Sequence, residues 1–163
     1  MRVLLLSLIV LLLSSCGFHL RGVADLPFDT LYIPNTGGFS VDVKRQIRAG
    51  TRTAVVDDPK AAQAQLVLSG ETRLRNILSL SGAGRVRELQ LVYAVDVRVH
   101  DGKGGDYLPT THLSVTRDLS YSDTDVLSKE AEEANIYREM QADLVQQILR
   151  RVSAATPPKP AVQ

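Results

Sequence analysis

Alternation of apolar and polar residues marks the middle of the chain. In residues 89–99 every odd position is Leu, Tyr or Val, and Gln90, Asp96 and Arg98 stand among the residues between them. Successive side chains of a strand point to opposite faces, so this period of two predicts a strand with one buried face. Residues 113–119 repeat the pattern and predict another strand.

Residues 65–75 predict an earlier strand of the same kind. One face is expected to be buried and holds Leu66, Leu68, Gly70, Thr72 and Leu74, whereas the other is expected to be wet and holds Ser69, Glu71, Arg73 and Arg75. Residues 79–87 contain Ser-Gly-Ala-Gly and two arginines, which favours a long hairpin turn, and the glycine-rich residues 101–106 predict a second turn. The three strands should form an antiparallel meander.

Two segments show the period of a helix. Phe39, Val43 and Ile47 recur at every fourth residue before Gly50, which predicts a helix of about three turns. A second apolar stripe runs along the end of the chain, and it contains Ile136, Met140, Leu144 and Ile148. That helix should begin near residues 122–125 and end at Val152. Its continuous length would be about 42 Å, at about 1.5 Å per residue, so a break near residues 133–135 remains an alternative.

The order of these elements favours an α+β fold. Residues 30–34 predict a first strand, and residues 51–56 add one more if they pair. Both helices should then cover one face of a mostly antiparallel sheet of four to five strands, as a two-layer sandwich. Residues 16–153 are expected to form this single domain. Residues 154–163, rich in Ala, Thr, Pro and Lys, are expected to form a disordered tail.

The first sixteen residues have the pattern of a lipoprotein leader. Arg2 precedes an apolar stretch at residues 3–13, and Ser14 and Ser15 then precede Cys16, the only cysteine. The stretch is shorter than the roughly 20 residues of a membrane-spanning helix, so residues 1–15 are predicted to be a cleaved signal peptide. Cys16 would carry diacylglycerol on its sulfur and an acyl chain such as palmitate on its nitrogen. A chance cysteine after an ordinary signal peptide is the alternative.

Cleavage changes the charge balance and bears on localisation. Removal of Arg2 leaves 18 of the 19 Lys and Arg residues against 18 Asp and Glu residues, so overall charge predicts neither nucleic acid nor an anionic surface as a partner. Gly17 stands where an aspartate would favour retention at the inner membrane. The chain is therefore expected at the outer membrane, held there by its lipid.

The sequence contains no pattern typical of an enzyme. The three histidines are dispersed, no Gly-x-Ser-x-Gly motif occurs, and the glycine-rich turns lack the spacing of phosphate-binding loops. We therefore expect no catalytic residue, no metal and no cofactor. Aromatic residues are too few and scattered for base stacking, which also argues against nucleic acid. A local cationic set remains around the predicted hairpin, either as an anion site or as a solubilising surface, and it comprises Arg73, Arg75, Arg85 and Arg87.

The segment Cys16-Gly17-Phe18-His19-Leu20-Arg21-Gly22 resembles the mature N-terminus of the lipopolysaccharide-assembly lipoprotein family, LptE. Further similarity lies in Leu31-Tyr32-Ile33, Glu88-Leu89-Gln90-Leu91 and Tyr137-Arg138-Glu139-Met140, and it extends to about Val152. The resemblance implies a non-enzymatic partner, about one to one, of the lipopolysaccharide-transport β-barrel LptD. Such a partner plugs the barrel, assists its assembly and contributes to lipopolysaccharide insertion. The resemblance also implies lipopolysaccharide binding by basic residues, for which Arg85, Arg87 and Arg138 are the first candidates and Arg73 and Arg75 the next.

Two other classes remain open. An accessory lipoprotein of another envelope lipid-transport complex would have the same anchor and the same type of domain. A binder of a soluble substrate would need a deep apolar pocket with convergent polar groups.

Overall fold

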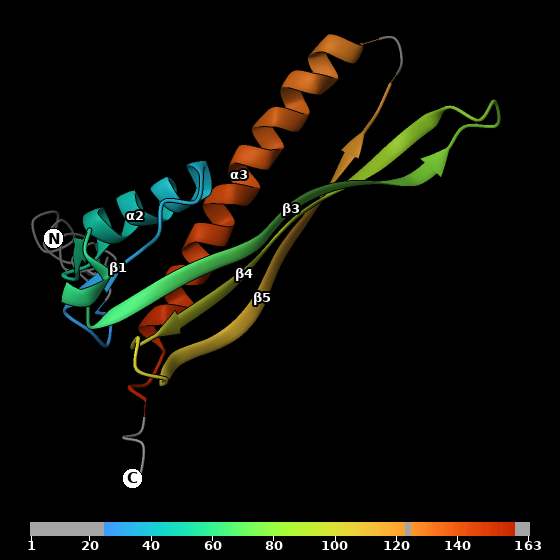
Figure 1. The fold of residues 1–163 in the computed structure, drawn as a ribbon. Helices are drawn as coiled ribbons and strands as arrows, with labels where there is room; N and C mark the ends of the chain where they lie inside the picture. Colours follow the sequence, from blue (N-terminus) through green and yellow to red (C-terminus); the bar gives the residue numbers. More distant parts are fainter. Residues whose placement is uncertain (1–24, 123–124, 159–163) are drawn as a thin grey trace, which may run out of the picture.

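Three long strands form most of the sheet in the computed structural model, which describes residues 25–122 and 125–158. β3 (Ala64–Leu80), β4 (Val86–His100) and β5 (Asp106–Ser120) pair antiparallel in chain order, so the predicted meander is confirmed. The helices α2 (Gly38–Gly50) and α3 (Val126–Ser153) cover one face of the sheet (Figure 1). The predicted α+β two-layer sandwich is therefore confirmed.

Two short parallel strands extend the sheet beside β3. β1 (Thr30–Tyr32) lies between β3 and β2 (Ala54–Val56), which gives the order β2-β1-β3-β4-β5. The pairing of β2 resolves the open question about residues 51–56 in favour of a fifth strand. A short 3₁₀-helix, η1 (Pro59–Ala61), connects β2 to β3.

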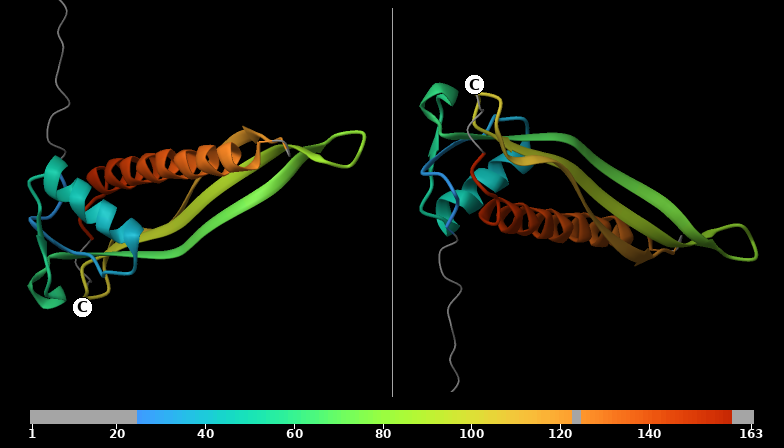
Figure 2. Two further views of the ribbon diagram at one scale, coloured as in Figure 1. Left: turned by 90° about the horizontal axis from the view of Figure 1, so that it is seen from above. Right: turned by 90° about the horizontal axis from the view of Figure 1, so that it is seen from below.

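α3 is one unbroken helix of 28 residues, about 42 Å long at about 1.5 Å per residue. Asp125 occupies its N-cap position, within the predicted start region. The alternative of a break at residues 133–135 does not occur. A helix of this length fits because β3 has 17 residues and extends about 56 Å at about 3.3 Å per residue. Helix and hairpin run in the same direction away from the end that contains β1 and α2 (Figure 2).

The core lies between the helices and the sheet. Phe39, Val43 and Ile47 of α2 are buried, as are Met140, Leu144 and Ile148 of α3, in agreement with both predicted stripes. The odd-numbered residues of β4 from Leu89 to Val99 are also buried. Tyr93 marks the centre of this core, because its ring contacts Phe39 of α2 and Tyr137 of α3 at centroid distances of 5.8 and 6.3 Å.

The hairpin turn is shorter than residues 79–87, so that prediction was wrong in extent. β3 continues to Leu80 and β4 begins at Val86. Ser81 and Arg85 close the turn, since the Ser81 N–H donates to the Arg85 carbonyl at 2.7 Å and Gly84 adopts φ +74°. Polar residues such as Ser79 and Glu88 resemble turn residues in sequence, but here they pair with each other at the end of the β3–β4 ladder.

A β-bulge at Gly70 reverses the two faces of β3. Pairing passes from Ser69 opposite Asp96 to Thr72 opposite Ala94, so β3 holds one residue more than β4, and Gly70 adopts φ +62°. An extra residue exchanges the sides to which later side chains point. The predicted faces were therefore wrong beyond residue 70. The arginines at 73 and 75 face the helices, and Leu74 faces outward with 50% of its surface exposed.

Candidate functional site

The five candidate arginines form two separate groups. Arg73, Arg75 and Arg138 line a groove of about 430 Å³ between β3 and α3, which we call the β3–α3 groove. Arg85 and Arg87 line a depression at the end of the hairpin, which we call the hairpin-end pocket. Pairing across the hairpin does not bring Arg73 and Arg75 beside Arg85 and Arg87, because Arg73 lies opposite Tyr93 and Arg75 opposite Leu91.

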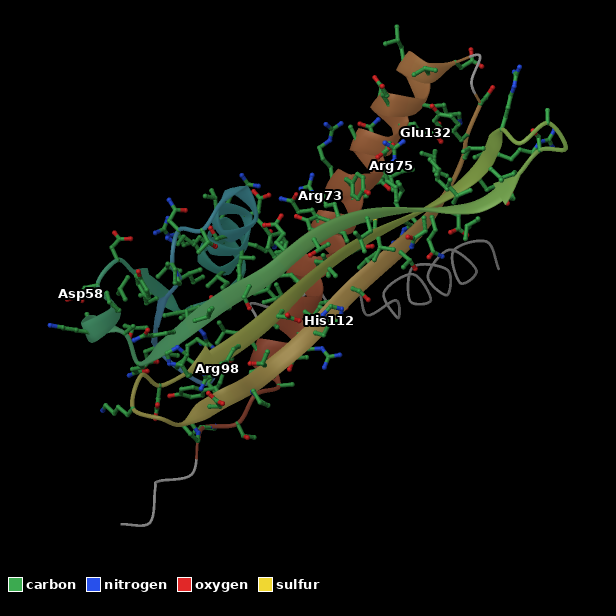
Figure 3. The ribbon with its side chains drawn as sticks, turned by 45° about the vertical axis from the view of Figure 1, so that its right-hand side comes forward. Asp58, Arg73, Arg75, Arg98, His112 and Glu132 are labelled. Carbon is green, nitrogen blue, oxygen red and sulfur yellow. The ribbon has the colours of Figure 1, made fainter. Side chains whose placement is uncertain are left out.

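Arg73 is the most constrained of the five. Its Nη2 donates to the Tyr93 hydroxyl and to Gln141 Oε1 of α3, each at 3.2 Å. Its guanidinium carbon lies 4.6 Å from the ring centroid of Tyr93 and 5.5 Å from that of Tyr137, in the geometry of cation–π contacts. Figure 3 shows this side chain on the α3 side of β3. The residue thus fastens β3 to the long helix.

The Tyr93 hydroxyl connects this arginine to an acid. It accepts from Arg73 and donates to Glu71 Oε1 at 2.6 Å. Burial of Tyr93, followed by its hydrogen bond to Glu71, raises the pKa of the phenol to about 12. The hydrogen bond to Tyr93 also raises the pKa of Arg73 above its ordinary value. Tyr93 and Arg73 therefore both keep their protons at neutral pH, which suits a structural network.

The other two arginines of the groove differ in their partners. Arg75 Nη2 lies 3.3 Å from Glu133 Oε2 on α3, and Figure 3 shows Arg75 beside that helix. Arg138 donates to Asn135 one turn earlier. Within residues 25–122 and 125–158, no carboxylate oxygen pairs with Arg138 at 4.0 Å or less. Arg138 therefore offers a planar donor to an external phosphate or carboxylate.

The hairpin-end pocket has a volume of about 630 Å³ and an open, polar lining. The Arg87 carbonyl accepts from the Tyr121 N–H at 2.7 Å, which holds the end of β5 beside β4. Three aliphatic side chains of the hairpin are close to half exposed or more: Ile77 at 58%, Leu78 at 48% and Leu80 at 56%. Of these, Leu80 lines the pocket together with Arg85 and Arg87, and guanidinium groups near an exposed aliphatic side chain match an amphiphile with an anionic head.

One charged residue facing α3 was missed as a site candidate in the sequence. Arg117 of β5 lies opposite Leu91, and its Nη2 contacts Asp143 Oδ2 of α3 at 2.5 Å. The signal was available, because Arg117 falls in the apolar register of residues 113–119. An arginine in that register indicates a partner across the layer interface.

The described part of the chain shows neither a metal cluster nor a spanning helix. No group of three or more His, Cys, Asp or Glu residues gathers in it. His112 Nδ1 lies 2.7 Å from Asp96 Oδ1, and His100 Nδ1 accepts from the Gly102 N–H. No described helix is long and apolar enough to cross a membrane. The predicted lipid site, Cys16, lies outside the described residues.

A two-layer α+β domain with arginine-lined grooves defines a protein suited to binding anionic groups. The family model "LptE: Lipopolysaccharide-assembly" matches residues 28–152, which include all five strands and all but the last residue of α3. The chain belongs to the LptE family of lipopolysaccharide-assembly lipoproteins, as the N-terminal resemblance predicted. This family is not a known enzyme family.

Individual relatives agree with this assignment. The lipopolysaccharide-assembly lipoprotein LptE of Pectobacterium atrosepticum is 30% identical over 156 residues, covering 91% of this chain and 83% of the relative. The solution structure of lipoprotein B from Nitrosomonas europaea is 41% identical, with a TM-score of 0.74 over 85% of this chain and 91% of that one. Rare lipoprotein B from Shewanella oneidensis, 21% identical, shares the fold with a TM-score of 0.67 over 77% and 94% of the two chains.

Proposed function

We propose that the chain is an outer-membrane lipoprotein that plugs the lipopolysaccharide-transport β-barrel LptD, assists its assembly and contributes to lipopolysaccharide insertion. The family match over residues 28–152 is the observation that carries this proposal. Residues 1–15 act as the cleaved signal, residues 16–153 form the domain and residues 154–163 form a tail. Cys16 carries the S-diacylglycerol and N-acyl chains, and two or more chains suffice for stable anchoring. The protein acts without catalysis, metal or cofactor.

The shape of the molecule supports a plug. The end with β1 and α2 is broad, while the β3–β4 hairpin projects as a narrow extension (Figure 2). The apolar band of an outer-membrane barrel is about 25 Å tall. β3 of the hairpin, about 56 Å long at about 3.3 Å per residue, exceeds that height. A domain anchored at its broad end can therefore extend through a barrel lumen.

The two arginine groups support binding of lipopolysaccharide. Arg85 and Arg87 line a pocket with the exposed side chain of Leu80 and suit an acylated, phosphorylated head. Arg138, with Arg73 and Arg75 next to it, supplies a second cationic surface. Arg85, Arg87 and Arg138 are the primary ligand candidates, as the family resemblance implies, and Arg73 and Arg75, which bond to Tyr93 and Glu133, are the next.

Affinity capture of the tagged, lipidated chain from detergent-solubilised outer membrane tests the partnership. We expect a large barrel of the LptD type in a ratio near one to one, and mass spectrometry of the chain should find acyl groups on Cys16. The matched control is Cys16→Ala, which should remain unacylated. Recovery of the chain alone, or with an inner-membrane transporter, would replace the plug by an accessory role in another lipid-transport complex.

Lipopolysaccharide binding is tested with paired substitutions in the mature chain. Arg85→Ala with Arg87→Ala should weaken binding by about a hundredfold or more, because each removes a charge-assisted donor worth about 1.5–3 kcal/mol. The control, Arg48→Ala with Arg150→Ala, removes two exposed arginines of the helices and should leave affinity unchanged. Equal weakening by both pairs would indicate non-specific attraction to charge.

A further inference from the structure

β3 has a pairing partner on only one side for most of its length. β4 pairs with it from Gln65 to Leu80, whereas β1 pairs only at Ala64 and Gln65. Residues 66–80 therefore present a second edge that no described strand covers. An open edge exposes a row of backbone N–H and C=O groups that can pair with another chain.

This edge lacks two of the usual protections against pairing, proline and lysine, and its charged residues Arg73 and Arg75 point toward the helices. Residues 66–80 contain neither proline nor lysine. Leu74 and Ile77 of this segment are 50% and 58% exposed. By contrast, the opposite edge strand, β5, contains Pro109, and its apolar side chains at 113, 115 and 119 are buried. The free part of β3 and the edge strand β5 thus differ, since of these two the β3 edge combines open backbone with exposed aliphatic groups.

Two bulges limit the regular part of the open edge. The ladder with β4 shifts between Ser69 and Thr72 and again between Ile77 and Ser79. Between these points, residues 72–77 continue without interruption, long enough for a partner strand of about six residues.

We propose that the open edge of β3 at residues 72–77 receives an extended segment of a protein partner by strand addition. Only another polypeptide offers alternating donors and acceptors at the spacing of a strand, which a lipid or a sugar does not. One backbone group of this segment already has a hydrogen-bond partner, because the Leu74 carbonyl accepts from the Tyr137 hydroxyl at 3.0 Å.

The side chains around the edge define the chemistry of the segment. On the helix side, the added strand would lie along the β3–α3 groove, where Arg138 has no carboxylate partner within the described part of the chain. On the outer side, it would contact Leu74. A segment that alternates acidic and aliphatic residues satisfies both faces. This contact is separate from lipopolysaccharide binding. It rests on the proposed function only in the identity of the protein that would supply the segment.

The test uses the isotope-labelled mature chain with Cys16→Ser and a synthetic nonapeptide of alternating Glu and Val. We expect the peptide to shift and protect backbone amides of residues 72–77 in NMR spectra, and we expect no response in β5. A matched Lys–Val peptide should not bind. A Glu–Val peptide N-methylated at every second residue keeps its charge but loses its donors, so it should lose binding as well.

Substitutions then separate strand addition from simple charge attraction. Arg138→Ala should weaken the Glu–Val peptide by about fivefold, as expected for one partly screened ion pair, while Arg48→Ala should leave it unchanged. Absence of binding, equal binding of the Lys–Val or N-methylated peptide, or dimerisation of the chain through β3 would each overturn the proposal. If barrel capture succeeds and peptide binding fails, only strand addition is lost. If peptide binding succeeds and barrel capture fails, the plug proposal is rejected and strand addition at the β3 edge is retained.

Discussion

Gly70 directs three later side chains of β3 toward the helices. Its φ of +62° lies in the left-handed region that side chains with a Cβ avoid, and a Cβ there would lie 2.9 Å from Asp96 Oδ2. The extra residue turns Arg73, Arg75 and Ile77 to the helix side, where they lie opposite buried residues of β4.

Gly70→Ala should lower the free energy of unfolding by about 2–3 kcal/mol, since backbone strain adds to the close contact with Asp96. The matched control is Gly84→Ala, where φ is +74° but nothing lies within 4 Å of the added Cβ. That change should cost only about 1–2 kcal/mol. Urea unfolding of both variants measures the difference. Equal losses would mean that the Asp96 side chain turns away without cost.

Tyr93 should titrate apart from exposed tyrosines. Its pKa is raised from 10.0 to about 12, so the folded protein keeps the phenolic proton where an unfolded chain loses it. Its contribution to stability is complete below pH 10 and is lost as the pH rises through 12. Tyrosinate absorbance of the folded chain should show a late phase that Tyr93→Phe removes. Because the pKa of Tyr137 is raised too, that residue remains in both samples as the internal comparison. An unchanged titration in Tyr93→Phe would contradict the assignment.

At the level of elements, α3 depends on one buried stripe. Met140 is fully buried against the sheet, whereas its neighbour Glu139 is exposed. Met140→Ala should destabilise the fold by about 2–5 kcal/mol through lost contacts and a residual cavity. Glu139→Ala should change stability by less than about 0.5 kcal/mol. Denaturant midpoints of the two variants provide the comparison, and a small effect of Met140→Ala would show that α3 is loosely packed.

The sequence predicted those elements whose period is uninterrupted. β4 alternates from Leu89 to Val99 with no extra residue of its own, because the bulges in this stretch lie on β3 and β5, and the stripe of α3 continues for several turns, so both agree with the structure. β3 was the exception, because Leu66 and Leu74 lie in the same alternating register on either side of an insertion that only pairing reveals. Alternation counts residues and does not report which of them the neighbouring strand skips.

The grouping of the candidate arginines was not predictable for a related reason. Arg75 and Arg138 are 63 positions apart in the chain, and they line one groove only because α3 packs over β5 and β4 on the face of the sheet toward which Arg75 points. Charge, motif and periodicity identified each arginine as a candidate. The bulge and the course of α3 determine which of them lie together, and both are properties of the tertiary fold.

At the level of the whole molecule, packing is uneven along the long axis. The helices and β1 cover the end where α3 ends, while the hairpin extends past the end of β5 (Figure 2). Residues 70–78 of β3 are all exposed, whereas alternate residues of β4 from Leu89 to Val99 are buried.

Amide hydrogen exchange should follow this gradient. Exchange in residues 72–80 of β3 should be faster than in residues 89–99 of β4, because local opening costs least where few apolar contacts are lost. Mass-spectrometric exchange on the mature chain measures both segments at once. Equal protection in the two would show that the hairpin and the core open as one unit.

The bulge at Gly70 also bears on how the length of this chain can change during evolution. A one-residue deletion at most positions of β3 would shift every later pair and turn each side chain to the opposite face. At residues 70–71, and again at Leu78, β3 already holds a residue that β4 does not match. Loss of one residue at either place leaves all other pairs intact. Natural length variation within this strand should therefore concentrate at these two positions.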